Sequence, residues 1–435
     1  MKTIAAHTLG CKVNQYDTQA MLELFQQDGY LIVSWDSPAD VYLLNTCTVT
    51  GVGDKKSLQM IRRVKREHPA STLIVCGCMA QQRGEKLLSL GVDLVLGTQR
   101  RHEVVSLLNQ VLQSGDQICA VAAMNSSLPF ERLSISSRNE HTRANLKIQE
   151  GCNNHCSYCI IPAVRGPIRS RPLEDIRDEV LRLRDAGYRE LVLTGIHLSS
   201  YGLDMDRSYS LLDVIQLIQE TDGILRVRIG SLEPTIATPS FASALRKADK
   251  VCPQFHLALQ SGSDTVLRRM RRRYNTTQYI EGVENLRLEF PKAAFTTDIL
   301  TGFPGETDDE FNETKAMISR IGFARIHVFP YSPRPNTEAA LLPGQLSNTE
   351  KERRVRELID LGNTAADQYL SSWIDQESII LPEEKLNGRW EGYTPEYIRV
   401  RLQPDAICSA GTPVRVRLKN VSHRCMSGLM IQDNI

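Results

Sequence analysis

Short apolar runs rich in β-branched residues alternate with amphipathic segments from residue 1 to about residue 112. The apolar runs cover residues 3–8, 41–45, 72–75 and 94–96, and their length is that of strands. Between them, residues 21–25, 58–64 and 104–111 place apolar side chains at helical spacing. This alternation predicts a parallel sheet with flanking helices.

A polar stretch follows, from residue 113 to about residue 142. It contains Gln113-Ser114-Gly115-Asp116 and Asn125-Ser126-Ser127-Leu128-Pro129. Such composition is typical of loops and linkers. We therefore expect one domain over residues 1–125 and the start of a second domain near residue 138.

The second domain, expected over residues 138–370, has a longer series of strand and helix patterns. Strand patterns start near residues 147, 191, 226, 255, 295 and 325, and a charged helix pattern precedes residue 370. This series predicts six βα units in a partial barrel, with active residues at the carboxyl ends of the strands. The open side of such a barrel would admit a large substrate.

Short alternating strands occupy the remainder, residues 371–435. Asn387-Gly388 is a strong signal for a hairpin turn, and residues 397–402 and 413–418 alternate in β fashion. The pattern predicts a small OB-like β-barrel. The fold class is therefore α/β, with a C-terminal β domain.

Composition narrows the class of protein. The chain has 435 residues, of which 41% are hydrophobic and 24% charged, with a net charge of +1. These values are ordinary for globular chains, and no stretch approaches the ~18 apolar residues of a membrane helix. The N-terminal segment has no apolar core of a secretion signal, so we expect a cytoplasmic protein with no membrane partner. In a reducing compartment, the 11 cysteines are expected to be metal ligands or catalytic groups.

Three cysteines stand close together just after the first strand of the second domain, in the pattern Cys152-x3-Cys156-x2-Cys159. Thiolates on one tight loop can hold three irons of a 4Fe-4S cluster and leave the fourth iron open. The alternative is a zinc site with His155 as the fourth ligand.

Three other cysteines, Cys11, Cys47 and Cys78, each follow a predicted strand. Loops at the carboxyl ends of neighbouring parallel strands converge on one crevice, so these distant thiols can meet there. A second cluster with an open iron is one interpretation, and buried cysteines acting as small hydrophobic residues are another. A redox pair of Cys76 and Cys78 is a third, although Cys76 lies within the strand and should point elsewhere.

The first cysteine segment resembles the signature loop of the radical S-adenosylmethionine superfamily. The resemblance covers Gly151-Cys152-Asn153-Asn154-His155-Cys156-Ser157-Tyr158-Cys159-Ile160-Ile161-Pro162. It implies that the open iron binds S-adenosylmethionine and that an electron from the cluster releases a 5′-deoxyadenosyl radical.

Around this loop we expect cofactor contacts from the aromatic residue before the last cysteine and from later strand ends. The candidates are Tyr158, Thr194, Gly195, Ser231, Glu233, Gln260 and Gly302. Thr194-Gly195-Ile196-His197 stands where many radical enzymes have a Gly-Gly-Glu segment that receives the amino group of the cofactor. His197 is expected to be a polar residue near the pocket, and Gly302-Phe303-Pro304-Gly305 has a tight turn as its alternative interpretation.

The whole chain is similar to the methylthiotransferases. The N-terminal matches are Leu9-Gly10-Cys11-Lys12-Val13-Asn14, Asn45-Thr46-Cys47-Thr48 and Cys76-Gly77-Cys78-Met79. The barrel matches are Leu259-Gln260-Ser261-Gly262-Ser263, Gly302-Phe303-Pro304-Gly305-Glu306-Thr307 and Tyr331-Ser332-Pro333-Arg334-Pro335. Residues 371–435 resemble the family's TRAM domain, an RNA-binding β-barrel.

This resemblance implies two 4Fe-4S clusters, held by Cys11, Cys47 and Cys78 and by Cys152, Cys156 and Cys159, with S-adenosylmethionine as cofactor. The implied reaction adds a methylthio group to adenine carbon 2 beside the tRNA anticodon, at position 37. Cys11-Lys12-Val13-Asn14 indicates the branch that acts on threonylcarbamoyl-adenosine. The implied partners are the tRNA anticodon loop, a flavodoxin- or ferredoxin-like electron donor and a sulfur source.

Three alternatives remain open from the sequence. Two lie within the family: methylthiolation of isopentenyl-adenosine in tRNA, and methylthiolation of an aspartate in a ribosomal protein. The third belongs to another class, a non-catalytic iron-sulfur protein that binds RNA.

RNA binding requires a local positive surface, because the net charge is close to zero. Between residues 397 and 424 the sequence has six arginines and lysines and one aspartate. Arg399 with Arg401, and Arg415 with Arg417, share a strand face and are expected to follow phosphates while Tyr393 or Tyr397 stacks a base. A solvated β face is the alternative. A second group, Arg268, Arg269, Arg271, Arg272 and Arg273, is expected to divide between helix packing and contacts to phosphate or cofactor carboxylate.

Overall fold

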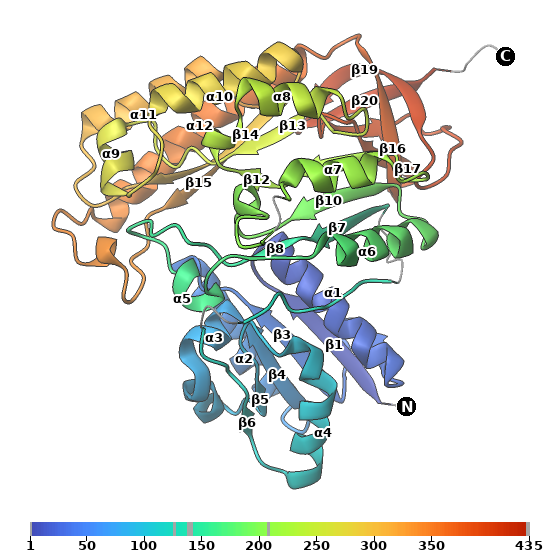
Figure 1. Cartoon of the computed structure of the whole chain (residues 1–435), viewed down its shortest axis with the longest axis vertical. Coiled ribbons are helices and arrows are strands. Elements are labelled where there is room, and N and C mark those ends of the chain that lie inside the picture. The colour runs from blue at the N-terminus through green and yellow to red at the C-terminus, as the bar shows by residue number, and fades with distance from the viewer. Residues whose placement is uncertain (1, 125–127, 137–141, 207–208, 432–435) are drawn as a thin grey trace.

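The structure is a computed structural model, and it describes residues 2–124, 128–136, 142–206 and 209–431 (Figure 1). The predicted N-terminal parallel sheet is confirmed. Its strands, in the order β2-β1-β3-β4-β5-β6, are β1 (Thr3–Thr8), β2 (Leu31–Val33), β3 (Val41–Thr46), β4 (Thr72–Gly77), β5 (Leu94–Val95) and β6 (Ile118–Cys119). The helices are α1 (Lys12–Gln27), α2 (Gly51–Glu67), α3 (Cys78–Arg83) and α4 (Val104–Ser114).

Both faces of this sheet are covered, because each strand carries apolar residues on both sides. Leu43 and Ile74 belong to the core beneath α1 and α4, which supply Met21 and Leu108. The intervening strand residues face α2 and α3 instead, as Val75 does. Such two-sided burial is typical of parallel sheets.

The expected linker is only partly a linker. Strand β6 pairs with β5, and Leu133 and Ile135 are buried in the main core. The polar composition of this stretch gave no sign that Leu133 and Ile135 would be buried. Residues 125–127 and 137–141 of this stretch, including the expected boundaries at 125 and 138, lie outside the described residues.

The middle of the chain forms the predicted partial barrel. Its strands are β7 (Arg143–Lys147), β10 (Glu190–Thr194), β11 (Arg226–Ile229), β12 (Ser231–Leu232), β13 (Gln254–Leu257), β14 (Ala294–Thr301) and β15 (Arg325–Pro330). They run in the orders β11-β10-β7 and β12-β13-β14-β15, and only Gly230 separates β11 from β12. Among the described residues no strand pairs β7 with β15, so this curved wall stays open.

Helices cover the outside of this wall, as Figure 1 shows. They are α6 (Leu173–Asp185), α7 (Leu211–Gln219), α8 (Pro239–Arg246), α9 (Asp264–Arg269), α10 (Thr276–Glu289), α11 (Asp308–Ile321) and α12 (Asn348–Ser371). A short antiparallel pair, β8 (Gln149–Glu150) and β9 (Arg169–Ser170), and helix α5 (Ile161–Arg165) follow β7. Along β14, Phe295 and Ile299 enter the main core, whereas Asp298 and Leu300 face the inside of the barrel. The inner face therefore carries both polar and apolar side chains.

The C-terminal strands close into the predicted small barrel. They are β16 (Glu377–Leu386), β17 (Arg389–Tyr393), β18 (Arg399–Leu402), β19 (Val414–Ser422) and β20 (Cys425–Met430). Asn387 and Gly388 turn the first hairpin at φ of 51° and 78°, as their sequence predicts. Strand β20 was not predicted, because its hairpin turns at His423 and Arg424, with φ of 48° and 58° and without glycine.

The small barrel is fixed to the amino ends of the partial barrel. Arg226 donates to the carbonyl oxygens of Ile379 and Tyr393 at 2.7 and 2.9 Å. Arg228 donates to the carbonyl oxygen of Pro395 at 2.8 Å. The carboxyl ends of the strands are thereby left for the N-terminal domain.

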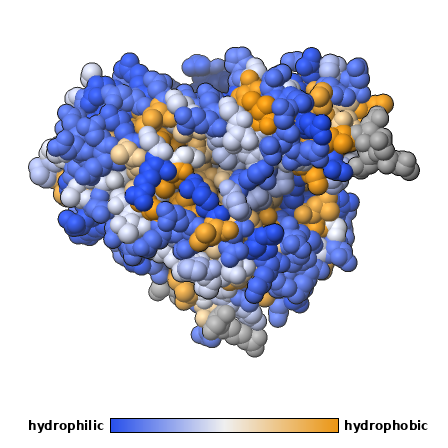
Figure 2. All heavy atoms as spheres, turned by 90° about the horizontal axis from the view of Figure 1, so that it is seen from above, coloured by the Kyte–Doolittle hydropathy of each residue, from blue (hydrophilic) through white to orange (hydrophobic). Residues whose placement is uncertain are grey.

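The outer face is mostly hydrophilic. Figure 2, which views the molecule from the top of Figure 1, shows apolar side chains scattered among polar ones. Over the described residues, no helix combines the length and apolar character needed to cross a bilayer.

Candidate active site

A cavity of about 560 Å³ lies between the N-terminal domain and the carboxyl ends of the partial barrel. Its lining comes from both domains. Six of its residues are the cysteines singled out from the sequence: Cys11, Cys47, Cys78, Cys152, Cys156 and Cys159. The structure thus brings both cysteine trios to one cavity.

Cys152, Cys156 and Cys159, called the C-terminal trio because they follow the other three in the sequence, lie on the loop between β8 and α5. The amide of Cys152 donates to the carbonyl oxygen of Gly166 at 3.0 Å, and the amide of Ser157 donates to that of Met270 at 3.0 Å. Gly151 has φ +72°, and a Cβ there would lie 1.8 Å from the carbonyl oxygen of Pro167. Backbone contacts therefore fix this loop without any metal.

Cys11, Cys47 and Cys78, the N-terminal trio, come from three separate segments. Cys11 caps the amino end of α1, Cys47 follows β3, and Cys78 begins α3. Strands β1, β3 and β4 are neighbours in the sheet, so the segments after them meet. A Cβ at Gly10 would lie 3.0 Å from the Cβ of Cys47, which shows how closely the first two segments approach.

The third segment depends on close packing around Gly77. Gly77, with φ +90°, precedes Cys78, and a Cβ there would lie 2.3 Å from Asn45 Oδ1 and 2.5 Å from the carbonyl oxygen of Thr46. A larger residue would displace the start of α3. The position of Cys78 therefore depends on glycine at residue 77.

The spacing of the thiols can be compared with that expected for a single zinc ion. Among the described residues, the only three His, Cys, Asp or Glu side chains whose ligand atoms all lie within 4.8 Å are His256, Asp298 and His327. In neither cysteine trio, therefore, are all three sulfurs that close. A single zinc ion with Zn–S bonds of ~2.3 Å would bring its sulfur ligands within roughly 4 Å of one another. Wider spacing and an all-thiol donor set fit a cluster, in which each sulfur binds a different iron.

His155, the fourth ligand of the zinc alternative, is exposed and does not line the cavity. The histidine side chain therefore stands apart from the three thiols that surround it in the sequence. The zinc interpretation loses its fourth ligand in this arrangement.

Burial sets the protonation of the thiols. Burial raises the pKa of Cys47 and that of Cys159 to about 12, and it also raises the pKa of Cys78 and of Cys152. These thiols are protonated at neutral pH in the metal-free protein. Binding of metal must therefore release protons, and the affinity of the sites rises with pH.

A buried arginine links the two trios. Arg165 donates through Nε to Cys78 Sγ at 3.3 Å and through Nη1 to Glu150 Oε1 at 2.9 Å, and it also contacts Asn14 Oδ1. Asn14 in turn donates to the carbonyl oxygens of Leu9 and Thr46 at 2.8 and 3.0 Å. Arg165 was not predictable from the sequence, because a lone arginine carries no spacing signal.

A buried ionic network extends behind this arginine. Lys147 Nζ lies 2.8 Å from Asp17 Oδ1 and 2.6 Å from Glu150 Oε2. Arg101 contacts Asp17, and its Nη2 lies 2.8 Å from Glu131 Oε2. Lys147 and Asp17 belong to different domains, so this contact forms only when the domains are docked.

Five of the seven residues expected near S-adenosylmethionine line the cavity: Tyr158, Gly195, Ser231, Glu233 and Gln260. Glu233 is the best connected, because it accepts hydrogen bonds from Asn154 at 3.3 Å and Arg272 at 3.2 Å, and its Oε2 lies 3.0 Å from His197 Nε2. Burial opposes its ionisation, but these partners outweigh burial and hold the pKa of Glu233 below its ordinary value. His197 is accordingly a polar residue beside the cavity.

The backbone of Gln260 is unusual, with φ of 64° in the left-handed region. Such a conformation costs a non-glycine residue roughly 1–2 kcal/mol. Its amide donates to the carbonyl oxygen of Asp298 at 2.9 Å, and its carbonyl accepts from Leu300 at 2.8 Å. Strain of this kind concentrates at functional sites, which supports a role for Gln260 in the cavity.

Thr194 and Gly302 do not line the cavity. The Thr194 hydroxyl donates to the carbonyl oxygen of Val192 at 3.1 Å, within its own strand. Gly302 has φ +73°, and its amide donates to Glu306 Oε2 at 2.6 Å. Gly302 therefore forms a tight turn, which was the alternative interpretation of its segment.

The basic strands of the small barrel are less positive than the local charge count predicts. Glu391 pairs with both Arg399 and Arg401, and Glu377 pairs with Arg415 and Arg417. Both acids come from the neighbouring strands, so the count along the local sequence missed them. RNA contact by these four arginines stays a prediction.

The tyrosines expected to stack a base are already engaged. The rings of Tyr393 and Tyr397 stack on each other at 4.7 Å, and the Arg143 guanidinium lies 4.7 Å from the Tyr393 ring centre. Arg228 lies over Tyr397 at 4.6 Å. These rings therefore belong to the junction of the small barrel with the partial barrel.

The arginine group at residues 268–273 has members in helix packing and in the cavity lining, and contact to phosphate or cofactor carboxylate stays a prediction. Arg269 pairs with Glu310 at 2.7 Å on the helical side. Arg272 lines the cavity, where it also reaches Cys156 Sγ at 3.4 Å.

Comparison with known proteins places these features in context. Residues 146–318 match the radical SAM superfamily, and residues 3–97 match uncharacterized protein family UPF0004. The chain is 41% identical to the threonylcarbamoyladenosine tRNA methylthiotransferase of Bacillus subtilis, over 92% of this chain and 90% of that protein. The enzyme of the same name from Thermotoga maritima is 34% identical, over 97% and 95%. A tRNA-2-methylthio-N6-dimethylallyladenosine synthase of Pelotomaculum thermopropionicum is 33% identical, over 89% and 88%.

Among solved structures, the fold resembles the radical S-adenosylmethionine methyltransferase TsrM of Kitasatospora setae. The TM-score is 0.57, with 14% sequence identity over 78% of this chain and 77% of that one. At this identity the likeness concerns the fold alone.

Proposed function

The chain belongs to the radical S-adenosylmethionine methylthiotransferase family, and from this premise we propose that it modifies N6-threonylcarbamoyl-adenosine in tRNA. The reaction adds a methylthio group to carbon 2 of the adenine at position 37, beside the anticodon. The observation that carries the proposal is the lining of one cavity by six cysteines from two domains. The segment Cys11-Lys12-Val13-Asn14 and the names of the relatives with 34% and 41% identity support this nucleoside.

The two cysteine trios have separate roles in this proposal. Cys152, Cys156 and Cys159 would hold the 4Fe-4S cluster that binds S-adenosylmethionine, and Cys11, Cys47 and Cys78 would hold a second 4Fe-4S cluster. When bound, the two clusters supply reductive cleavage of S-adenosylmethionine and a sulfur atom for methylation and transfer. An adenine C–H is not acidic, so hydrogen-atom removal suits it better than a side-chain base.

The residues beside the C-terminal trio suit a charged cofactor. Glu233 presents an ionised carboxylate, which complements the ammonium group of S-adenosylmethionine. Gly195 also lines the cavity, and its own segment packs so closely that a Cβ there would lie 2.8 Å from Leu198 Cδ2. We propose that Tyr158, Ser231 and Gln260 complete the contacts to the cofactor, since they share this part of the lining.

Apolar residues protect the reacting groups. Ile196, Leu232, Leu300 and Phe329 line the cavity between the polar groups. Exclusion of water prevents side reactions of a radical and strengthens the polar contacts that remain.

The three parts of the chain divide the work on tRNA. We assign residues 1–125 to the second cluster, residues 138–370 to S-adenosylmethionine chemistry, and residues 371–435 to RNA binding as a TRAM-like domain. A base beside the anticodon must leave the loop stack to enter the cavity, as base-modifying enzymes require. Arg399, Arg401, Arg415 and Arg417 would contact the phosphates of the stem or loop.

One second candidate has a specific observation in its favour. The relative from Pelotomaculum thermopropionicum carries the name of a dimethylallyladenosine enzyme and is 33% identical. That nucleoside has an apolar substituent, whereas threonylcarbamoyl-adenosine carries a carboxylate.

The test is an anaerobic reaction of the reconstituted protein with S-adenosylmethionine, reduced flavodoxin as electron donor and sulfide as sulfur source. Two tRNAs are offered, one with threonylcarbamoyl-adenosine and one with dimethylallyladenosine at position 37. Mass spectrometry of the nucleosides should show a methylthio product from the first tRNA. A product from the second tRNA alone would reject the proposed substrate, and no product from either would reject the activity.

A further inference from the structure

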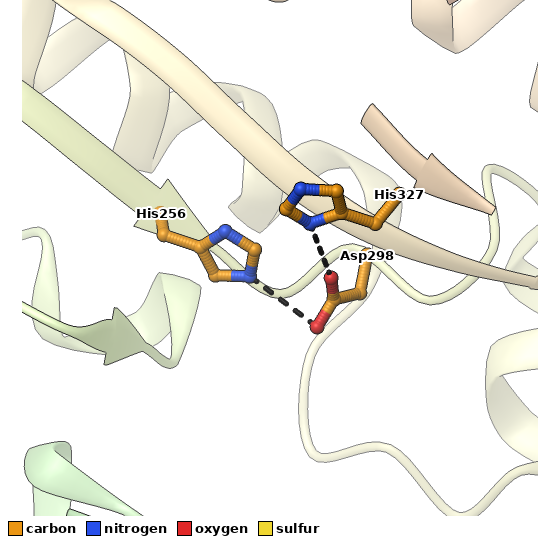
Figure 3. A group of neighbouring side chains, drawn as sticks. All are labelled: His256, Asp298 and His327. Atoms are coloured by element: carbon orange, nitrogen blue, oxygen red, sulfur yellow. Dashed lines mark hydrogen bonds and ion pairs between the residues drawn. The ribbon is translucent and has the colours of Figure 1, made fainter. Parts of the chain in front are cut away.

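A histidine-aspartate-histidine group adjoins the cysteine cavity, and Figure 3 shows its three side chains. His256, Asp298 and His327 come from β13, β14 and β15, which are neighbours in one sheet. His327 stands directly opposite Asp298 in the register of β14 and β15. Asp298 is also part of the cavity lining, so the group adjoins the candidate active site.

Both imidazoles point at the two oxygens of one carboxylate, as Figure 3 shows. His327 Nδ1 lies 3.1 Å from Asp298 Oδ1, and His256 Nε2 lies 3.4 Å from Oδ2. One ligand atom from each side chain lies within 4.8 Å of the other two. Metal bonds of ~2.0–2.2 Å place neighbouring ligand atoms roughly 3–4 Å apart, so little movement separates this arrangement from coordination.

The surroundings of His256 resemble those of a metal-ligating histidine. The second ring nitrogen, Nδ1, lies 3.0 Å from Thr296 Oγ1, which also accepts a hydrogen bond from Gln254 Nε2 at 3.3 Å. A partner on the nitrogen that does not bind the metal fixes the orientation of the ring. Thr296 thus has the position of an outer partner.

The charge of the carboxylate is also suitable. Each of its two oxygens faces one imidazole, at 3.1 and 3.4 Å. The arginines of the cavity lining do not compete for it, because Arg165 pairs with Glu150 and Arg272 pairs with Glu233. The site is reachable as well, with the Asp298 side chain 35% exposed and that of His327 39% exposed.

We propose that His256, Asp298 and His327 bind one divalent transition-metal ion, separate from the two cysteine sites. Two imidazoles and a carboxylate favour a borderline ion such as Zn²⁺ or Fe²⁺ over Mg²⁺ or Ca²⁺. Three protein ligands leave coordination positions free, and an oxygen donor in the adjoining cavity would occupy them. The proposal does not depend on the proposed function, since it follows from these three strands alone.

The test counts zinc in the reconstituted protein, with its cysteine sites filled with iron. The protein is dialysed anaerobically against buffered Zn²⁺ without free iron, and bound zinc is measured by mass spectrometry. We expect one zinc per chain in the unchanged protein, with the affinity reduced ~100-fold or more in Asp298→Asn and His327→Gln. X-ray absorption at the zinc edge should show nitrogen and oxygen ligands at ~2.0–2.2 Å and no sulfur at ~2.3 Å.

Two further variants make the test specific. Thr296→Val removes only the outer partner and should weaken zinc binding ~10–100-fold, without removing a ligand. His102→Gln is the control, because His102 is exposed on the N-terminal domain, and its zinc binding should match that of the unchanged protein. The proposal is overturned if the unchanged protein binds no zinc, if all variants bind it equally, or if the bound zinc has sulfur ligands. Should a ligand variant fail to fold, Thr296→Val still decides the question.

Discussion

The two cysteine sites face one cavity but are built in opposite ways. Cys152, Cys156 and Cys159 share a single loop, whose backbone is held by hydrogen bonds to Gly166 and Met270 of the same domain. The N-terminal trio, in contrast, comes from three loops at the edge of a sheet, and the buried Arg165 of the second domain holds Cys78. The loop site depends on its own domain alone, whereas the assembled site needs the sheet and the domain junction as well.

This contrast predicts that the N-terminal site is the more fragile of the two. Changes at the domain junction should damage it first and leave cleavage of S-adenosylmethionine at the other site intact. Each change below is chosen to separate the two sites.

The largest effect is expected from replacing Cys11, Cys47 and Cys78 together by alanine. The methylthio product should fall to background, because no thiols remain to hold the second cluster. Formation of 5′-deoxyadenosine should persist, since the other trio is unchanged. The control replaces Cys119, Cys408 and Cys425, which do not line the cavity, and should retain both activities. A methylthio product from the first variant would contradict the separate roles of the trios.

Arg165→Met should be the most destabilising single change. It leaves Glu150 without its closest guanidinium partner in a fully buried position, at a cost of about 3–5 kcal/mol. Denaturant unfolding measures the loss, and iron analysis should show that the N-terminal site is depleted first. Arg100→Met, which removes an exposed pair with Glu103, should cost at most about 1 kcal/mol. Equal losses in the two variants would show that the junction does not depend on Arg165.

Two glycine-to-alanine variants should each damage a different cysteine site. In Gly77→Ala, the new Cβ would clash with the Asn45 side chain and the carbonyl oxygen of Thr46. This clash and the left-handed strain together should cost about 3 kcal/mol. Gly151→Ala should do the same to the C-terminal loop and abolish 5′-deoxyadenosine formation. In Gly115→Ala the backbone is left-handed too, but a Cβ meets no atom within 4 Å, so only about 1–2 kcal/mol is expected. Loss of 5′-deoxyadenosine in Gly77→Ala would mean that the sites are not independent.

Acid should loosen the junction through Glu131. Burial opposes ionisation of this carboxyl, but Arg101 and His102 outweigh burial and lower its pKa to about 2. A lowered pKa stabilises the folded state above the unfolded value of about 4.5, and that stability is lost as pH falls towards 2. The full contribution is about 3 kcal/mol. Glu131→Gln should lower the free energy of unfolding at pH 7 and reduce its dependence on pH between about 4.5 and 2. An unchanged dependence on pH would show that Glu131 does not cause the loss of stability in acid.

The smallest effect is expected on the small barrel. Arg415→Glu with Arg417→Glu should weaken tRNA binding and reduce its salt dependence by fewer than about two phosphate contacts, because Glu377 already neutralises part of this charge. Binding measured at several salt concentrations gives the slope. Arg66→Glu on the far N-terminal domain is the control, and equal effects of both variants would exclude a specific role of the barrel.

Much of the fold follows from local pattern, and so does one of the sites. The strand runs at residues 3–8, 41–45 and 72–75 end within two residues of β1, β3 and β4, because each run contains apolar residues that are buried in the sheet. The C-terminal cysteine loop was evident from its spacing alone.

Features that depend on distant partners were not predictable. Strand β20 needs a hairpin of His423 and Arg424 in left-handed conformation, which their sequence does not announce. The pairing of Glu391 with Arg399 requires knowledge of which strands are neighbours, and the role of Arg165 requires the docked domains. Side-chain partners set by tertiary structure are thus where local inference ends.

The most direct test of the account is the iron and acid-labile sulfide content of anaerobically reconstituted protein. The unchanged chain, the variant without the N-terminal trio and a matching variant of Cys152, Cys156 and Cys159 are compared. The account predicts that each variant retains about half of the iron of the unchanged chain. If one variant retains all of the iron, or the unchanged chain holds only a single cluster, the two-site account is wrong.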